Sequence, residues 1–147
     1  LLNRLKALEA KTYEAVPTER STGEHPIRRI TSPHDDRIEV GIAHEATDGA
    51  IDRAMTSAAK SQPAWDALGG EERAALLERV ADLFEEERET LFSLCMREAG
   101  KTLPDAVLEV REAVDFLRYY AAEARSKFTH ALPLPGQTGE INELRLR

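Results

Sequence analysis

The sequence of residues 98–121, EAGKTLPDAVLEVREAVDFLRYYA, constrains the fold more than any other stretch of the chain. From there to residue 128, apolar residues recur every three or four positions, a spacing that places them along one side of a helix. They are Leu103, Ala106, Val107, Val110, Ala113, Val114, Leu117, Tyr120, Ala121, Ala124 and Phe128. Gly100 suits the end of a preceding helix, and Thr102 suits the start of the next because its hydroxyl can accept a free backbone N–H. The stretch therefore predicts a tight turn followed by a long amphipathic helix.

The rest of the chain predicts three more amphipathic helices, a short N-terminal helix and a β-hairpin. The helices are expected over residues 1–13, from Thr47 or Asp48 to near Pro63, and over residues 71–86 and 88–99. The hairpin is expected to pair residues 27–30 with residues 37–46, where Ile38, Val40 and Ile42 alternate with polar residues or glycine. Gly69 and Gly70 are expected in an interhelical loop, residues 16–24 in a polar connector, and the residues after Phe128 in an extended tail. The predicted fold class is thus mostly α: four amphipathic helices plus an N-terminal hairpin.

The predicted core follows from the composition. Aromatic residues make up 5% of the chain and hydrophobic residues 41%, so the core must be built mainly from Ala, Leu, Val and Ile, with Trp65 as its one very large side chain. In the helix over residues 71–86, the side chains expected to face inward are Leu76, Leu77, Val80, Leu83 and Phe84.

Charge and hydropathy exclude two classes of partner. The formal net charge is −7, from 27 acidic and 20 basic residues, which repels the phosphate backbone of nucleic acids. The sequence has no apolar run long enough to cross a bilayer and no signal-like segment at its start. A cytoplasmic protein that does not bind nucleic acid is therefore expected.

Few residues qualify as candidates for chemistry. Cys95 lies on an apolar stripe between Leu91 and Ala99, where a small buried side chain is more plausible than a nucleophile. The four histidines lack metal-ligand spacing, so no metal site is expected. No glycine-rich phosphate-binding motif occurs either. Lys101 is interpreted as a structural residue at the end of a helix, with a role as a phosphate or substrate ligand as the alternative.

Several stretches in order resemble one enzyme family. ITSPHDDRIEVGIAHEAT, AMTSAAKSQPAWDALGGEERAALLERVADLFE, GKTLPDAVLEVREAVDFLRYYA and LPLPGQTGEINELRLR resemble the N-terminal part of the aldehyde dehydrogenase superfamily. The resemblance is greatest to the dehydrogenase half of the bifunctional proline utilization A enzymes. It implies that residues 24–147 form the incomplete, helical N-terminal part of an α/β aldehyde dehydrogenase domain, and that residues 1–23 form a helix and a linker.

The resemblance also implies a parent enzyme that oxidises L-glutamate γ-semialdehyde to glutamate with NAD in proline catabolism. The family uses a cysteine nucleophile, a glutamate base, an asparagine that stabilises the oxyanion and a dinucleotide-binding domain. None of these matches a position in this chain, so the chain alone is expected to be inactive and to bind no NAD. Its expected partners are the remainder of the dehydrogenase domain, an upstream proline dehydrogenase domain and, through uncovered apolar faces, other copies of itself.

The resemblance singles out two residues of the long helix. In the glutamate semialdehyde dehydrogenases, the acidic residue just before the V-D-F sequence approaches the substrate pocket, and that position is Glu112 in this chain. Phe116 is a candidate for the wall of the same pocket. The alternative for Glu112 is a boundary residue that pairs with Arg111 or Arg118. An alternative for the whole chain is a free-standing acidic helical module that binds a partner and has no catalytic activity.

Overall fold

The computed structural model describes residues 1–18 and 26–146 and confirms a mostly helical chain. The chain divides into two compact units. Unit 1 comprises Leu1–Lys60 and Glu87–Val110, and unit 2 comprises Ser61–Glu86 and Arg111–Arg147. The expected connector over residues 16–24 lies mostly outside the described residues.

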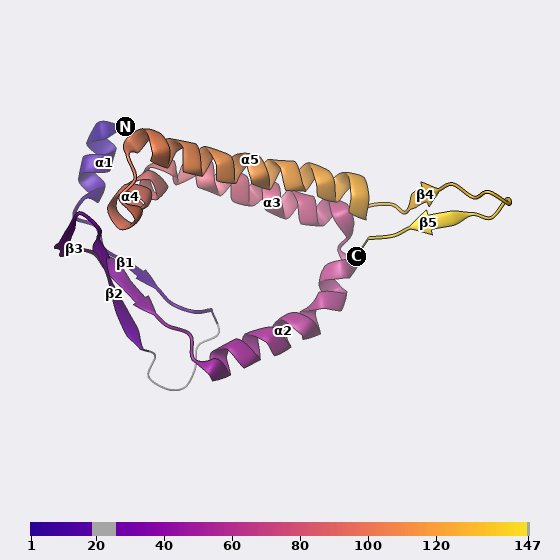
Figure 1. The fold of residues 1–147 in the computed structure, drawn as a ribbon, viewed down its shortest axis with the longest axis horizontal. Coiled ribbons are helices and arrows are strands. Elements are labelled where there is room, and N and C mark those ends of the chain that lie inside the picture. Colours follow the sequence, from indigo (N-terminus) through magenta and orange to yellow (C-terminus); the bar gives the residue numbers. More distant parts are fainter. Residues whose placement is uncertain (19–25, 147) are drawn as a thin grey trace. The chain divides into compact units, whose positions relative to one another are not determined.

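In the part of unit 1 that the structure describes, a three-stranded sheet accompanies α1 (Leu2–Leu8), the first part of α2 (Asp48–Ala67), α4 (Arg88–Ala99) and the first residues of the long helix (Figure 1). Its strands are β1 (Tyr13–Ala15), β2 (Ile27–Ser32) and β3 (Asp35–His44), in the order β1-β3-β2. The predicted hairpin is confirmed as the antiparallel β2–β3 pair, whose register joins Ser32 to Asp35 across a turn at Pro33 and His34. β1 pairs parallel with β3, so the expected helix over residues 1–13 is wrong at its C-terminal end. α1 covers only Leu2–Leu8.

The core of unit 1 joins α1 to α4 (Arg88–Ala99) and to the start of α5 (Leu103–Phe128). It consists of Leu5, Phe92, Ala106 and Val110. Arg97 of α4 fixes the segment after α1, because its guanidinium donates to the carbonyl oxygens of Leu8 at 3.1 Å and Lys11 at 2.7 Å. These carbonyls lie where a helix end leaves acceptors without helical partners. The partner of the N-terminal helix, which is not evident from the sequence, is therefore α4.

The junction between α4 and α5 confirms the predicted turn. Gly100 ends α4 with φ +68°, a left-handed conformation that glycine adopts without steric cost. The Asp105 N–H donates to the Thr102 hydroxyl oxygen at 3.3 Å, and that hydroxyl donates to the Asp105 carboxylate at 2.6 Å. Thr102 therefore caps α5, as predicted.

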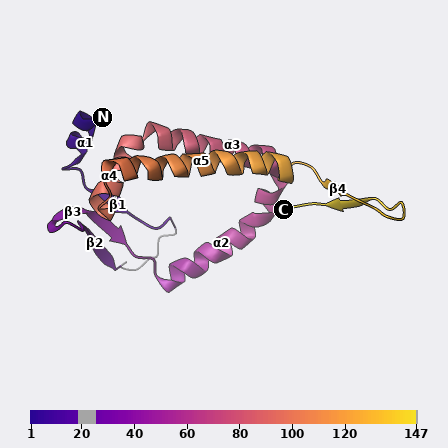
Figure 2. The ribbon, with the colours of Figure 1, turned by 45° about the horizontal axis from the view of Figure 1, so that its top comes forward.

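Unit 2 contains α3 (Gly69–Glu86), the part of α5 from Arg111 onward, and a two-stranded sheet of β4 (Leu132–Leu134) and β5 (Asn142–Leu144). α3 and this part of α5 lie side by side in both ribbon views (Figures 1 and 2). The tail expected to be extended is an antiparallel hairpin.

The face that α3 buries differs in part from the prediction. The buried residues are Gly70, Ala74 and Ala81, and the predicted Leu77 and Phe84 are half-buried, whereas Leu76, Val80 and Leu83 are 46%, 38% and 47% exposed. A side chain added at Gly70 would lie 2.3 Å from the Ala124 carbonyl oxygen, which shows how closely the two helices approach. Small residues permit that approach, and Leu76, Val80 and Leu83 lie outside it. Gly70 and Gly69 also belong to α3 rather than to the expected loop.

Three other expectations are wrong. α2 runs over Asp48–Ala67 and contains Pro63, because the helical bias against the residue before proline is a preference that a helix can override. Trp65 is 47% exposed and is not a core residue of the described structure. Tyr120, expected on the buried side of α5, is exposed.

Thr47 caps α2 as expected, since its hydroxyl oxygen accepts a hydrogen bond from the Ala50 N–H at 3.3 Å.

Candidate functional site

Glu112 and Phe116 lie one helical turn apart on an exposed side of α5, within unit 2. Two tyrosines, Tyr119 and Tyr120, follow on the same side of the helix. The Phe116 and Tyr120 rings stack with centroids 6.0 Å apart, and Tyr119 meets Tyr120 edge-on at 5.2 Å. Val114 and Ala121, which are buried, mark the opposite side of the helix. The structure therefore presents one carboxylate at the end of an exposed aromatic cluster, which we call the Glu112–Tyr120 stripe (Glu112, Phe116, Tyr119 and Tyr120).

The neighbouring arginines are engaged elsewhere. Arg111 approaches Asp115 at 3.8 Å, and Arg118 approaches Asp82 of α3 at 3.6 Å. Among residues 1–18 and 26–146, no hydrogen bond or ion pair involves Glu112. The alternative in which Glu112 pairs with Arg111 or Arg118 therefore finds no support, and its carboxylate is available to a cationic group.

Cys95 lies in unit 1, seventeen residues before Glu112 in the sequence. It is half-buried and packs against the core of Leu5, Phe92, Ala106 and Val110. Burial raises the pKa of its thiol, so little thiolate forms near neutral pH. This environment agrees with the structural role expected for Cys95.

Lys101 lines a cavity of about 430 Å³ in unit 1 together with His34, Ser93 and Arg97, among others. Its ammonium lies 2.5 Å from the Glu109 carboxylate, which raises the pKa of Lys101. Two other polar groups of the cavity are also engaged: His34 Nδ1 lies 2.8 Å from Ser32 Oγ, and Arg97 donates to backbone carbonyls. The interaction of Lys101 with Glu109 gives it a structural partner that the sequence did not indicate.

The described histidines do not converge on a metal site. His44 Nε2 lies 2.7 Å from a carboxylate oxygen of Glu14, and His34 contacts Ser32 as above. His25 lies outside the described residues. No group of three His, Cys, Asp or Glu side chains in the described part of the chain could hold a metal ion.

The described residues contain no glycine-lined connection from a strand to a helix of the kind that binds a dinucleotide. Within residues 26–146, the strand that leads directly into a helix is β3, and its connection to α2 is Glu45-Ala46-Thr47, without a glycine. A pyrophosphate needs close approach to backbone N–H groups at such a junction. We therefore assign no NAD-binding residue to this chain.

Comparison with known proteins identifies the family of this chain. The sequence profile of the aldehyde dehydrogenase family matches residues 20–145. The chain belongs to the aldehyde dehydrogenase family, and its fold is part of the fold of that family.

The relatives include PutA proteins and 1-pyrroline-5-carboxylate dehydrogenases. The chain is 41% identical over 124 residues to the bifunctional protein PutA of Klebsiella aerogenes, a match that covers 84% of this chain and 10% of the relative. It is 30% identical over 146 residues to the 1-pyrroline-5-carboxylate dehydrogenase of Bacillus licheniformis, covering 94% of this chain and 28% of the relative. Among solved structures, it resembles proline utilization A from Bdellovibrio bacteriovorus with a TM-score of 0.84 and 27% identity, covering 97% of this chain and 15% of that one.

This chain corresponds to only a small part of each relative. It spans about a tenth of the length of the PutA relative and about a quarter of the dehydrogenase relative. No helix of the described residues is long and apolar enough to cross a membrane.

Proposed function

We propose that this chain is the N-terminal helical part of an NAD-dependent dehydrogenase that oxidises L-glutamate γ-semialdehyde to glutamate. In that proposal residues 24–147 belong to the dehydrogenase domain, and residues 1–23 lead into it from a preceding segment such as a proline dehydrogenase domain. The similarity to PutA and to 1-pyrroline-5-carboxylate dehydrogenase supports the assignment. The enzyme acts in the cytoplasm.

One observation of the structure carries the substrate assignment. Glu112 presents a carboxylate without a described partner beside the exposed ring of Phe116. L-Glutamate γ-semialdehyde carries an α-ammonium group at the end opposite its aldehyde. A carboxylate held next to an apolar ring suits that arrangement, because it can pair with the ammonium while the ring covers the methylene chain. Glu112 and Phe116 therefore bind the amino-acid end of the substrate in this proposal.

The remaining chemistry lies outside this chain. Oxidation of the aldehyde transfers a hydride to NAD and adds an oxygen atom from water, and the enzymes of this family use a cysteine to carry the acyl group between the two steps. Cys95 does not suit that role, because its thiol is held half-buried in the core of unit 1 with a raised pKa. The nucleophile and the dinucleotide site come from the remainder of the domain, the principal partner of this chain.

The test compares two purified polypeptides: the 147-residue chain and the full-length protein that contains it. Both are assayed for NADH formation at 340 nm with pyrroline-5-carboxylate as the source of the semialdehyde. The full-length protein is expected to reduce NAD with this substrate, and the 147-residue chain is expected to show no activity above the background without enzyme. A thermal shift of the 147-residue chain with NAD is expected to be zero.

Two results would contradict the proposal. Activity of the 147-residue chain alone would show that it contains a nucleophile, and Cys95→Ser would then identify it. Absence of NAD reduction by the full-length protein with pyrroline-5-carboxylate would contradict the substrate assignment and favour the alternative, a helical module that binds a partner.

A further inference from the structure

The contact between α3 and α5 in unit 2 combines apolar packing with a specific ionic interaction. The fully buried residues are Gly70, Ala74 and Ala81 on α3, and Val114 and Ala121 on α5. The small residues allow close approach of the two helices, and Val114 is the largest of the five. An ionic interaction adds directional contacts that help to fix the register of α5 on α3.

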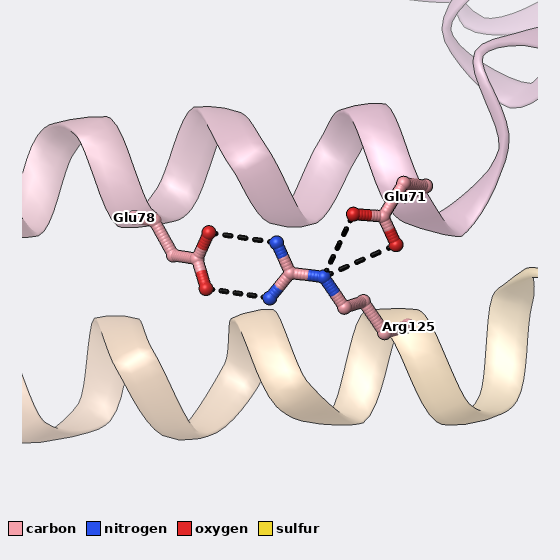
Figure 3. Close-up of polar contacts among 3 residues, drawn as sticks. All are labelled: Glu71, Glu78 and Arg125. Carbon is pink, nitrogen blue, oxygen red and sulfur yellow. Dashed lines mark hydrogen bonds and ion pairs between the residues drawn. The ribbon is translucent and has the colours of Figure 1, made fainter.

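Arg125 provides that interaction (Figure 3). Its Nη1 and Nη2 atoms donate to the two carboxylate oxygens of Glu78, at 2.5 and 2.7 Å. Its Nε donates to the two oxygens of Glu71, at 2.9 and 3.1 Å. A planar guanidinium that engages two carboxylates two turns apart on one helix satisfies both only at one axial position and one rotation. The pKa of Glu78 is lowered, chiefly by its hydrogen bonds to Arg125.

Arg118 extends the ionic contact along the same flank of α5. It lies 3.6 Å from Asp82 and 3.9 Å from Glu85 of α3, which are looser contacts than those of Arg125. Arg118 and Arg125 are seven residues apart and therefore lie almost in line along the helix. The bidentate interaction of Arg125 is tighter, so it contributes more than Arg118 to fixing the axial position and rotation of α5 on α3.

The register determines where the Glu112–Tyr120 stripe points. Glu112 precedes Arg125 by thirteen residues, about 20 Å along the axis and roughly 140° around it. A slip of one residue rotates the stripe by roughly 100°, which would turn the Glu112 carboxylate away from its direction in the structure.

We propose that Arg125 is a positioning residue for the substrate end of the active site, acting through Glu112 by fixing the register of α5 on α3. The inference rests on the proposed function, because it takes the Glu112–Tyr120 stripe as part of the substrate pocket. Arg125 itself does not touch the substrate. Exposed ion pairs contribute little to the free energy of folding, so the effect of Arg125 falls on binding geometry more than on stability.

The test is a double-mutant cycle in the full-length enzyme with Arg125→Lys and Glu112→Gln. Lysine keeps the positive charge of Arg125, but its ammonium cannot reproduce the paired hydrogen bonds that the guanidinium makes to Glu78 and Glu71. For Arg125→Lys we expect KM for L-glutamate γ-semialdehyde to rise three- to tenfold, kcat to change less than twofold, and KM for a simple aliphatic aldehyde such as propanal to stay unchanged. In the Glu112→Gln background the same substitution is expected to leave KM unchanged. Glu78→Gln is expected to reproduce the pattern of Arg125→Lys.

Lys127→Met is the matched control. Lys127 pairs with Glu123 on α5 itself, so its loss removes a surface ion pair without touching α3. It is expected to leave both KM values unchanged. Thermal melting of each variant reports whether the fold persists.

Three results would overturn the positioning role: Arg125→Lys and Glu78→Gln without effect on KM, an equal rise in KM for both aldehydes, or an undiminished effect in the Glu112→Gln background. Failure of the proposed function has a different signature, because Glu112→Gln alone would then leave the KM for the semialdehyde unchanged.

Discussion

Substitution of Gly70 by alanine should weaken the packing of α3 against α5 in a measurable way. The new Cβ would lie 2.3 Å from the Ala124 carbonyl oxygen, 2.6 Å from Thr129 Oγ1 and 2.8 Å from the Thr129 nitrogen. Unstrained C···O contacts are about 3.3 Å or longer, so the helices must separate by roughly 1 Å. Overpacking of this kind costs about 1–3 kcal/mol, and the better helix propensity of alanine offsets about 0.5–1 kcal/mol of it.

The assay is urea unfolding of the 147-residue chain, followed by circular dichroism at 222 nm. The free energy of unfolding of Gly70→Ala is expected to fall by about 1–2 kcal/mol relative to the unsubstituted chain. Gly49→Ala is the control, because a Cβ at this helical glycine would meet its nearest atom, Arg53 Nη1, at 3.4 Å. That variant should be unchanged or more stable by up to about 1 kcal/mol. Equal changes in the two variants would refute the close-contact reasoning.

Three other properties of the isolated chain should follow from the structure. The exposed Leu76, Val80 and Leu83 of α3 should make it self-associate with rising concentration, and Leu83→Glu should reduce this association in sedimentation velocity; a monomer at all concentrations would count against it. Cys95 should react with a disulfide reagent at least tenfold more slowly in the folded chain than in urea, and equal rates would contradict the burial that raises its pKa. The hydrogen bond from the Thr138 hydroxyl, together with backbone N–H groups, lowers the pKa of Glu140 from 4.5 to about 2, so its contribution to the β4–β5 turn is complete above about pH 4.5 and is lost as the pH falls towards 2. The amide shifts of the turn in NMR spectra should titrate with a midpoint near pH 2 in the unsubstituted chain but not in Glu140→Gln.

Local signals predicted the elements whose ends are set by neighbouring residues. Gly100 and Thr102 lie within a few residues of the groups that they cap, so the boundary between α4 and α5 could be read from the sequence. The turn at Pro33 and His34 was predictable for the same reason, because the residues that it joins, Ser32 and Asp35, are neighbours in the sequence.

Features that depend on distant partners could not be predicted in this way. The buried side of α3 includes Gly70, which closely approaches Ala124, and hydrophobicity alone does not distinguish the half-buried Leu77 from the exposed Leu76 and Leu83. β1 forms because Tyr13 pairs with Gly41 of β3, a contact that helical periodicity in the first residues conceals. Helical spacing did place Glu112 and Phe116 on one side of α5, but the pairing of Arg125 with Glu71 and Glu78 joins residues about fifty positions apart.

The central claim is that Glu112 binds the charged end of an amino-acid aldehyde. The most direct measurement is the ratio of kcat/KM for L-glutamate γ-semialdehyde to kcat/KM for propanal, in the full-length enzyme, its Glu112→Gln variant and a Glu72→Gln control. Glu72 is an exposed carboxylate in the first turn of α3. Loss of a charge-assisted interaction of about 1.5–3 kcal/mol predicts that the ratio falls by about ten- to a hundredfold in Glu112→Gln and stays unchanged in Glu72→Gln. An unchanged ratio in Glu112→Gln would contradict the account.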